Sequence, residues 1–122
     1  MADARILICD DEPALRELMR LALDGGYEIA EASNAAEALA GARDFRPDLI
    51  LLDVMMPGES GLEVLRRLRL DPELAPTTVI IVSAWSSESD RRAAAAADRF
   101  VGKPFDPEEL ASIVEELLVA RR

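Results

Sequence analysis

Short apolar runs alternate with segments of helical periodicity along the whole chain, and this alternation constrains the fold more than any other feature of the sequence. Residues 49–52, Leu-Ile-Leu-Leu, are apolar without a break, and residues 78–82 form a similar run. A strand that is apolar on both faces belongs in the interior of a parallel sheet, because helices then cover both of its sides. The sequence therefore predicts an α/β fold.

The expected elements follow the order strand, helix, repeated along the chain. Strands are expected at residues 5–9, 27–32, 49–52, 78–82 and 99–102, with a helix after each of them. Helices between parallel strands require right-handed crossovers, which gives a single doubly wound parallel sheet of the (βα)5 type. We expect residues 1–122 to form one domain, since this length suits one hydrophobic core.

Local signals set the helix boundaries with unequal strength. Pro13 suits the first turn of a helix, and Asn34 followed by Glu37 has the spacing of a capping box. Apolar residues from Leu62 to Leu70 recur at helical spacing. Residues 86–97 are less well defined, because consecutive alanines favour a helix but bury little apolar surface.

The composition excludes several kinds of function. A net charge of −10 repels phosphates, so we expect no direct nucleic acid binding by this domain. The sequence has no histidine, which excludes zinc sites built on imidazole and a phosphohistidine on this chain. No apolar run approaches the length of about 20 residues that spans a bilayer, and residues 6–9 are too short a run for a signal peptide. We therefore expect a cytoplasmic protein without membrane contact, and the single Cys9 fits a reducing compartment.

Polar residues follow the expected strands at the points where they end. They are Asp10 and Asp11, Asp53, Ser83 and Lys103. Ligands of open α/β sheets bind at the carboxyl ends of the strands, so we expect these side chains to share one site. Carboxylates in one cleft repel each other, and a divalent cation would relieve that repulsion. A donor set made only of oxygens suits Mg²⁺.

The same residues predict phosphoryl transfer. Asp53 beside a hard cation is a nucleophile for phosphorus, Lys103 offers a compact positive charge, and Ser83 offers a hydroxyl donor. Together they would stabilise the charge of a transferring phosphoryl group and yield an aspartyl phosphate. Each residue also has an ordinary interpretation: helix caps for Asp10 and Asp11, a loop acid for Asp53, a strand terminator for Ser83 and a surface lysine for Lys103.

These segments resemble the receiver domain of two-component response regulators. The resemblance is carried by Asp10-Asp11, by residues 51–58 (Leu-Leu-Asp-Val-Met-Met-Pro-Gly) with Gly61, by Val82-Ser83-Ala84 and by Lys103-Pro104-Phe105, and it covers nearly the whole chain. It implies a flavodoxin-like fold with strand order 2-1-3-4-5. It also implies that Asp53 is the phosphoacceptor and that Mg²⁺ is held by Asp10, Asp11, Asp53 and the backbone carbonyl of Met55.

The resemblance implies further roles. Ser83 is expected to be the switch hydroxyl, Phe100 the aromatic switch residue and Lys103 the phosphoryl ligand, with a cis peptide bond before Pro104. A sensor histidine kinase or a histidine phosphotransfer protein is expected to supply the phosphoryl group, and an output domain or effector of unknown kind is expected to read the result. Such a domain promotes only its own phosphorylation and dephosphorylation, so it is a signalling switch rather than an enzyme. Many receivers dimerise weakly, so a weak homodimer is compatible with the resemblance.

The sequence departs from the family pattern around its fourth helix. Lys103 follows Ser83 by 20 positions, about two fewer than the family usually has, which predicts a shortened or irregular fourth helix. Trp85 is unusually bulky, and with Met55 it is expected to flank the pocket, shield the acyl phosphate and slow its hydrolysis.

Two other functions compete with this interpretation. A phosphatase of the haloacid-dehalogenase-like class also uses an Asp nucleophile, but it needs a second Asp two positions later, where this chain has Met55. A pseudo-receiver would be an interaction domain that is never phosphorylated. The complete acidic set and Lys103 speak against that alternative.

Overall fold

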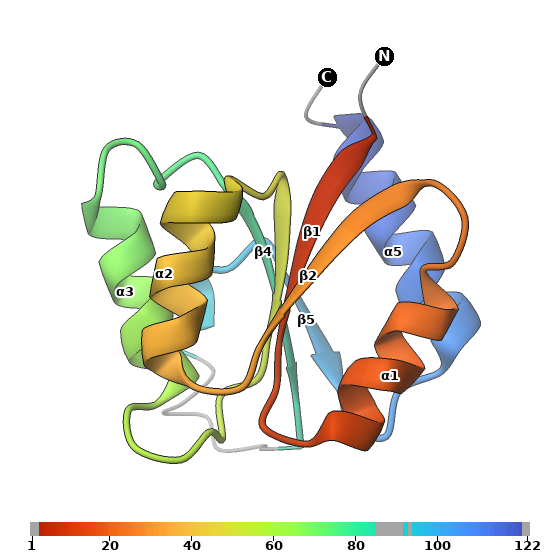
Figure 1. Ribbon diagram of the computed structural model, residues 1–122, viewed down its shortest axis with the longest axis horizontal. Helices are drawn as coiled ribbons and strands as arrows, with labels where there is room; N and C mark the ends of the chain where they lie inside the picture. The colour runs from red at the N-terminus through yellow and green to blue at the C-terminus, as the bar shows by residue number, and fades with distance from the viewer. Residues whose placement is uncertain (1–2, 85–91, 93, 121–122) are drawn as a thin grey trace.

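The computed structural model describes residues 3–84, 92 and 94–120, which form a five-stranded parallel sheet covered by helices on both faces (Figure 1). The strands are β1 (Ala4–Cys9), β2 (Tyr27–Ala32), β3 (Leu49–Leu52), β4 (Thr78–Ser83) and β5 (Arg99–Gly102). Their order across the sheet is β2-β1-β3-β4-β5, with β2 and β5 at the edges. The predicted doubly wound α/β fold and its strand order are confirmed.

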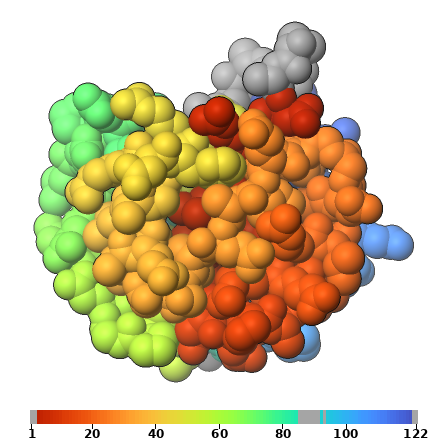
Figure 2. Space-filling model, viewed as in Figure 1, coloured from red at the N-terminus to blue at the C-terminus, as the bar shows by residue number. Residues whose placement is uncertain are grey.

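The helices lie in two layers that sandwich the sheet. Helices α2 (Ala35–Phe45) and α3 (Gly61–Leu70) cover one face, and α1 (Pro13–Ala22) and α5 (Pro107–Ala120) cover the other (Figure 1). In the view of Figure 2, residues of α1, β2 and α2 form most of the visible surface, and α3 lies at its left side. The edge strand β2 is therefore the strand most open to solvent on this side.

The central strands are apolar on both faces because each face packs on a different helix layer. In β3, Ile50 and Leu52 point into the cluster that includes α2 and α3, while Leu49 and Leu51 point into the cluster that includes α1 and α5. All four are at most 1% exposed. This alternation is the structural reason for the unbroken apolar run in the sequence.

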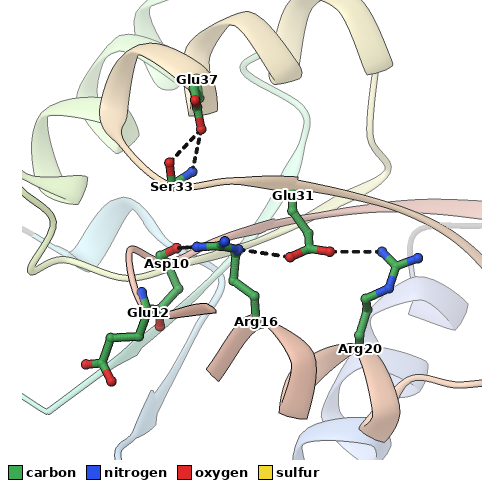
Figure 3. Close-up of polar contacts among 7 residues, drawn as sticks. All are labelled: Asp10, Glu12, Arg16, Arg20, Glu31, Ser33 and Glu37. Carbon is green, nitrogen blue, oxygen red and sulfur yellow. Dashed lines mark hydrogen bonds and ion pairs between the residues drawn. The ribbon is translucent and has the colours of Figure 1, made fainter. Parts of the chain in front are cut away.

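The capping box predicted at α2 forms, but one of its two hydrogen bonds involves a different residue. The Asn34 side chain accepts a hydrogen bond from the Glu37 backbone N–H at 2.9 Å, as predicted. The Glu37 carboxylate, however, accepts from the N–H and the hydroxyl of Ser33, both at 2.8 Å, rather than from Asn34 (Figure 3). These hydrogen bonds lower the pKa of Glu37 from its usual value.

The segment of the expected fourth helix lies largely outside the described residues. Trp85, with its predicted shielding role, is outside them, as are 86–91 and 93. Within the described part, Ala94–Ala96 form a single 3-10 turn, η1, before β5. None of the helices within the described ranges is both long and apolar enough to cross a bilayer.

The packing of α3 yields a matched test of the core. Leu68 is 0% exposed and Leu70, two residues later in the same helix, is 68% exposed. Leu68→Ala should lower the free energy of unfolding by about 2–5 kcal/mol, because it leaves a cavity between α3 and the sheet. Leu70→Ala should change it by less than about 0.5 kcal/mol. Urea unfolding of both variants checks this, and equal effects would contradict the packing described.

Candidate functional site

The polar residues after the strands meet at one edge of the sheet because the strands are parallel and in register. Cys9 pairs with Leu52, and the next residue, Asp53, continues the ladder by donating its N–H to the Cys9 carbonyl at 2.9 Å. In the same way Lys103 donates its N–H to the Ser83 carbonyl at 3.0 Å. The sheet itself therefore fixes the backbone from which these side chains project.

An ion-pair cluster of one lysine and two aspartates lies at the centre of this edge. The Lys103 Nζ is 2.7 Å from Asp10 Oδ2 and 3.3 Å from Asp53 Oδ2. Asp10 is 0% exposed and Asp53 is 4% exposed. One ammonium balances one of the two carboxylates, so one negative charge is left over when both are ionised. Burying such a charge is costly, and a cation or a change of protonation state would offset that cost.

The protonation equilibria of the cluster reflect this imbalance. Burial raises the pKa of Asp53 above its usual value, although the hydrogen bond from the Met55 N–H and the charge of Lys103 oppose the rise. Burial disfavours the charged form of Lys103, but the hydrogen bond to Asp10 and the charge of Asp53 outweigh it and raise the pKa of Lys103. Lys103 is therefore protonated at neutral pH, next to an Asp53 carboxylate whose charge it balances only in part.

Ser83, the last residue of β4, carries a buried hydroxyl. Its side chain is 0% exposed, and its Oγ has no hydrogen-bond partner among the residues that the structure describes. An unpaired buried hydroxyl costs free energy of the order of 1–3 kcal/mol. A group that presents acceptor oxygens at this edge would remove that cost.

The donor set fits a hard divalent cation. Carboxylate oxygens of Asp10, Asp11 and Glu12 can lie within 4.8 Å of one another, and all are oxygen donors of the kind that Mg²⁺ prefers. Glu12 was not among the predicted ligands. The signal that could have found it is the run of three successive acids that ends with Glu12, directly before Pro13.

The structure does not show Asp10 and Asp11 as simple helix caps. The N-cap residue of α1 is Glu12, and its side chain makes no capping hydrogen bond. Asp10 Oδ1 instead accepts from the Glu12 N–H at 2.9 Å, while its other oxygen faces Lys103. Asp10 thus supports the turn into α1 and belongs to the ion-pair cluster at the same time.

The backbone after Asp53 passes very close to the start of α3. A Cβ built on Gly61 would lie 2.1 Å from the Asp53 carbonyl oxygen, and the Gly61 N–H donates to the Val54 carbonyl at 2.9 Å. Only glycine permits this approach. Within the same loop the Met55 N–H donates to Asp53 Oδ1 at 3.1 Å, and the Met55 side chain is 65% exposed.

The remaining predicted residues lie on β5 and the loop that follows. Phe100 is partly buried and packs against the core cluster on the α2 and α3 side. The Lys103–Pro104 peptide bond is cis, the isomer that the resemblance implies. The role of Phe100 as a switch and that of the Met55 carbonyl as a metal ligand stay predictions.

The close approach at Gly61 gives a second test with a matched control. Gly61→Ala should lower the free energy of unfolding by about 1–3 kcal/mol, because the new methyl group collides with backbone rather than with a flexible side chain. It should do so even though alanine favours helix over glycine. Gly102→Ala, whose Cβ would meet nothing within 4 Å, should have little effect. Urea unfolding distinguishes the two, and an unaffected Gly61→Ala would refute the geometry of this loop.

Comparison with known sequences places these features in a family. The sequence model of the family described as "Response regulator receiver domain" matches residues 6–115. The phosphate regulon transcriptional regulatory protein PhoB of Pseudomonas aeruginosa is 40% identical over 121 residues, which cover 97% of this chain and 53% of that protein. The transcriptional regulatory protein ResD of Bacillus subtilis is 40% identical over 119 residues, 95% of this chain and 48% of ResD. The chain thus spans about half the length of these curated relatives.

Solved structures agree with the sequence comparison. A CheY-like response regulator receiver domain protein from Methanospirillum hungatei has a TM-score of 0.90 at 30% identity, covering 98% of this chain and 97% of that one. The response regulator TrrA from Thermotoga maritima, solved in complex with Mg²⁺ and BeF, has a TM-score of 0.84 at 40% identity, covering 93% of this chain and 98% of that one.

Proposed function

Since the chain belongs to the response regulator receiver domain family, we propose that it is a phosphoacceptor switch in which Asp53 receives the phosphoryl group. The observation that carries the proposal is the contact of Lys103 Nζ with the buried Asp53 carboxylate, 3.3 Å away, at the carboxyl edge of the sheet. A sensor histidine kinase or a histidine phosphotransfer protein supplies the phosphoryl group from a phosphohistidine. Residues 1–122 act together as one receiver domain in the cytoplasm.

The transfer uses the side chains at this edge in distinct ways. A carboxylate oxygen of Asp53 forms a bond to phosphorus as the bond between phosphorus and the imidazole nitrogen breaks, and that electron pair stays on the imidazole. Lys103 is close enough to shift its ammonium from the carboxylates to a phosphoryl oxygen. The Ser83 hydroxyl, which has no hydrogen-bond partner within the described ranges, donates to another phosphoryl oxygen.

A magnesium ion is the proposed cofactor of this step. Asp10, Asp11, Asp53 and the Met55 carbonyl would hold it, and the proximity of Glu12 adds a further oxygen near Asp10 and Asp11. The excess negative charge around Lys103 supports this assignment. When bound, Mg²⁺ would balance the charge of the carboxylates and of the phosphoryl oxygens.

Phosphorylation is proposed to act as a local electrostatic event with a distant effect. The new charge draws Ser83 and Lys103 toward the phosphoryl group, Phe100 turns inward, and the surface around the fourth helix and β5 changes. The relatives named above are transcriptional regulators about twice as long as this chain. An output domain or effector would therefore read the change, while this acidic domain itself makes no contact with nucleic acid. Trp85 and Met55 would shield the acyl phosphate from water.

The phosphoacceptor assignment predicts a specific covalent adduct. Incubation with acetyl phosphate and Mg²⁺ should add one phosphoryl group, visible in the intact mass, to the wild type and to Asp24→Asn. Asp24 is an exposed aspartate outside the site, so it controls for the substitution itself. Asp53→Asn should show no adduct, because its neutral amide has no carboxylate oxygen to attack phosphorus and form an acyl phosphate. An adduct on Asp53→Asn, or none on the wild type, would favour the pseudo-receiver alternative.

The buried hydroxyl of Ser83 predicts opposite effects on stability and on chemistry. Ser83→Ala removes a hydroxyl that has no hydrogen-bond partner among the described residues, so the free energy of unfolding should stay equal or rise by up to about 1 kcal/mol. The rate of phosphorylation by acetyl phosphate should fall by at least about tenfold, because one donor to the phosphoryl group is lost. Ser112→Ala, at an exposed serine of α5, should leave the rate unchanged and raise the stability only by the helix preference of alanine, about 0.5 kcal/mol. Urea unfolding and mass kinetics measure both quantities, and a loss of stability without a slower reaction would contradict the assigned role.

A further inference from the structure

An arginine on α1 reaches back to the proposed metal site. The Arg16 Nη1 donates a hydrogen bond to the backbone carbonyl oxygen of Asp10 at 2.7 Å (Figure 3). The Arg16 side chain is only 17% exposed. The bond is therefore partly shielded from water, where a hydrogen bond from a charged donor is worth more than a neutral one.

Every polar atom of Asp10 has a partner in the described structure, and Arg16 supplies one of the four. The Asp10 N–H donates to the Ala32 carbonyl at 3.0 Å, and its carboxylate oxygens accept from the Glu12 N–H at 2.9 Å and from Lys103 Nζ at 2.7 Å. Two of these partners are backbone groups, and Lys103 belongs to the proposed site. Within residues 3–84, 92 and 94–120, Arg16 is the one side chain outside that site that holds the peptide group between Asp10 and Asp11.

The position of Arg16 is itself fixed from the edge strand. Its Nε donates to Glu31 Oε1 at 2.9 Å, so the planar guanidinium spans from β2 to the loop after β1. The other oxygen of Glu31 accepts from Arg20 Nη1 at 3.2 Å (Figure 3). Because the planar guanidinium is held at both Glu31 and the Asp10 carbonyl, it fixes the position of that carbonyl. The single ammonium of a lysine could not reproduce this arrangement.

We propose that Arg16 is a positioning residue for the divalent-cation site, holding the Asp10–Asp11 peptide so that both carboxylates face the cation. This inference rests on the proposed function, because it assumes that Asp10 and Asp11 are metal ligands. Groups that orient metal ligands without touching the metal commonly change affinity by about 10- to 100-fold when removed.

The direction in which the Mg²⁺ affinity changes when Arg16 is removed distinguishes a positioning role from a purely electrostatic one. A guanidinium next to an acidic cluster repels a cation, so removing a charge alone would tighten Mg²⁺ binding. Removing a hydrogen bond that positions the metal ligands would instead weaken Mg²⁺ binding. A residue that serves only the stability of α1 would leave the affinity unchanged.

Calorimetric titration of the full chain with Mg²⁺ alone, without a phosphoryl donor, tests the proposal. Arg16→Ala should bind Mg²⁺ about tenfold more weakly than the wild type. Arg16→Lys keeps the charge but not both hydrogen bonds, so its Mg²⁺ affinity should lie between that of the wild type and that of Arg16→Ala. Arg20→Ala removes the other arginine paired with Glu31 and leaves the bond to Asp10 in place, so its affinity should match the wild type. Urea unfolding of the metal-free variants checks that each is folded.

The outcomes distinguish this inference from the function on which it rests. Unchanged or tighter Mg²⁺ binding by Arg16→Ala, with a wild type that binds Mg²⁺ and is phosphorylated on Asp53, overturns the inference alone. If Arg16→Ala does not fold, a wild-type affinity in Arg16→Lys overturns it. A wild type that binds no Mg²⁺ and forms no adduct overturns both.

Discussion

The ion-pair cluster of Lys103 with Asp10 and Asp53 is the interaction on which the rest of the structure depends. Its three side chains come from the ends of β5, β1 and β3, so it can form only if these strands are parallel and in register. Two carboxylates that are almost fully buried need such a partner, because an unpaired buried charge is costly. Because one ammonium serves two acids, the cluster holds its geometry and still favours a further positive charge. The remaining negative charge supports the phosphoacceptor role proposed above, because that role requires a cation beside the Asp53 carboxylate.

The surroundings of the cluster are unfavourable in ways that a ligand would relieve. Burial raises the pKa of Asp53, and the Ser83 hydroxyl is buried without a hydrogen bond inside the described ranges. Proteins commonly accept such local costs where function requires them, and the apolar layers on both faces of the sheet supply the compensating stability.

The sequence predicts the fold well because strands that are covered by helices on both faces must be apolar throughout, and this pattern is visible in the sequence. The strands bounded by Tyr27 and Ala32 and by Leu49 and Leu52 were predicted to the residue, and strand ends were sufficient to bring Asp10, Asp53, Ser83 and Lys103 together. Contacts that depend on side-chain reach across the fold were not predictable. The hydrogen bond from Arg16 to the Asp10 carbonyl depends on the conformation of the turn into α1. The hydrogen bond from Ser33 to Glu37 depends on the rotamer of the Glu37 side chain. The proximity of Glu12 to the two aspartates arises from the same turn.

A crystal structure of the chain grown with Mg²⁺ and fluoroberyllate, which mimics a phosphoryl group on a carboxylate, is the measurement that shows whether Asp53 is the phosphoacceptor. We expect beryllium bonded to an oxygen of Asp53, with fluorines within hydrogen-bonding distance of Lys103 Nζ and Ser83 Oγ. We also expect a cation among the carboxylates of Asp10, Asp11 and Asp53. Beryllium bound at another residue, or at Asp53 with no fluorine within hydrogen-bonding distance of Lys103 or Ser83, would contradict the proposed site.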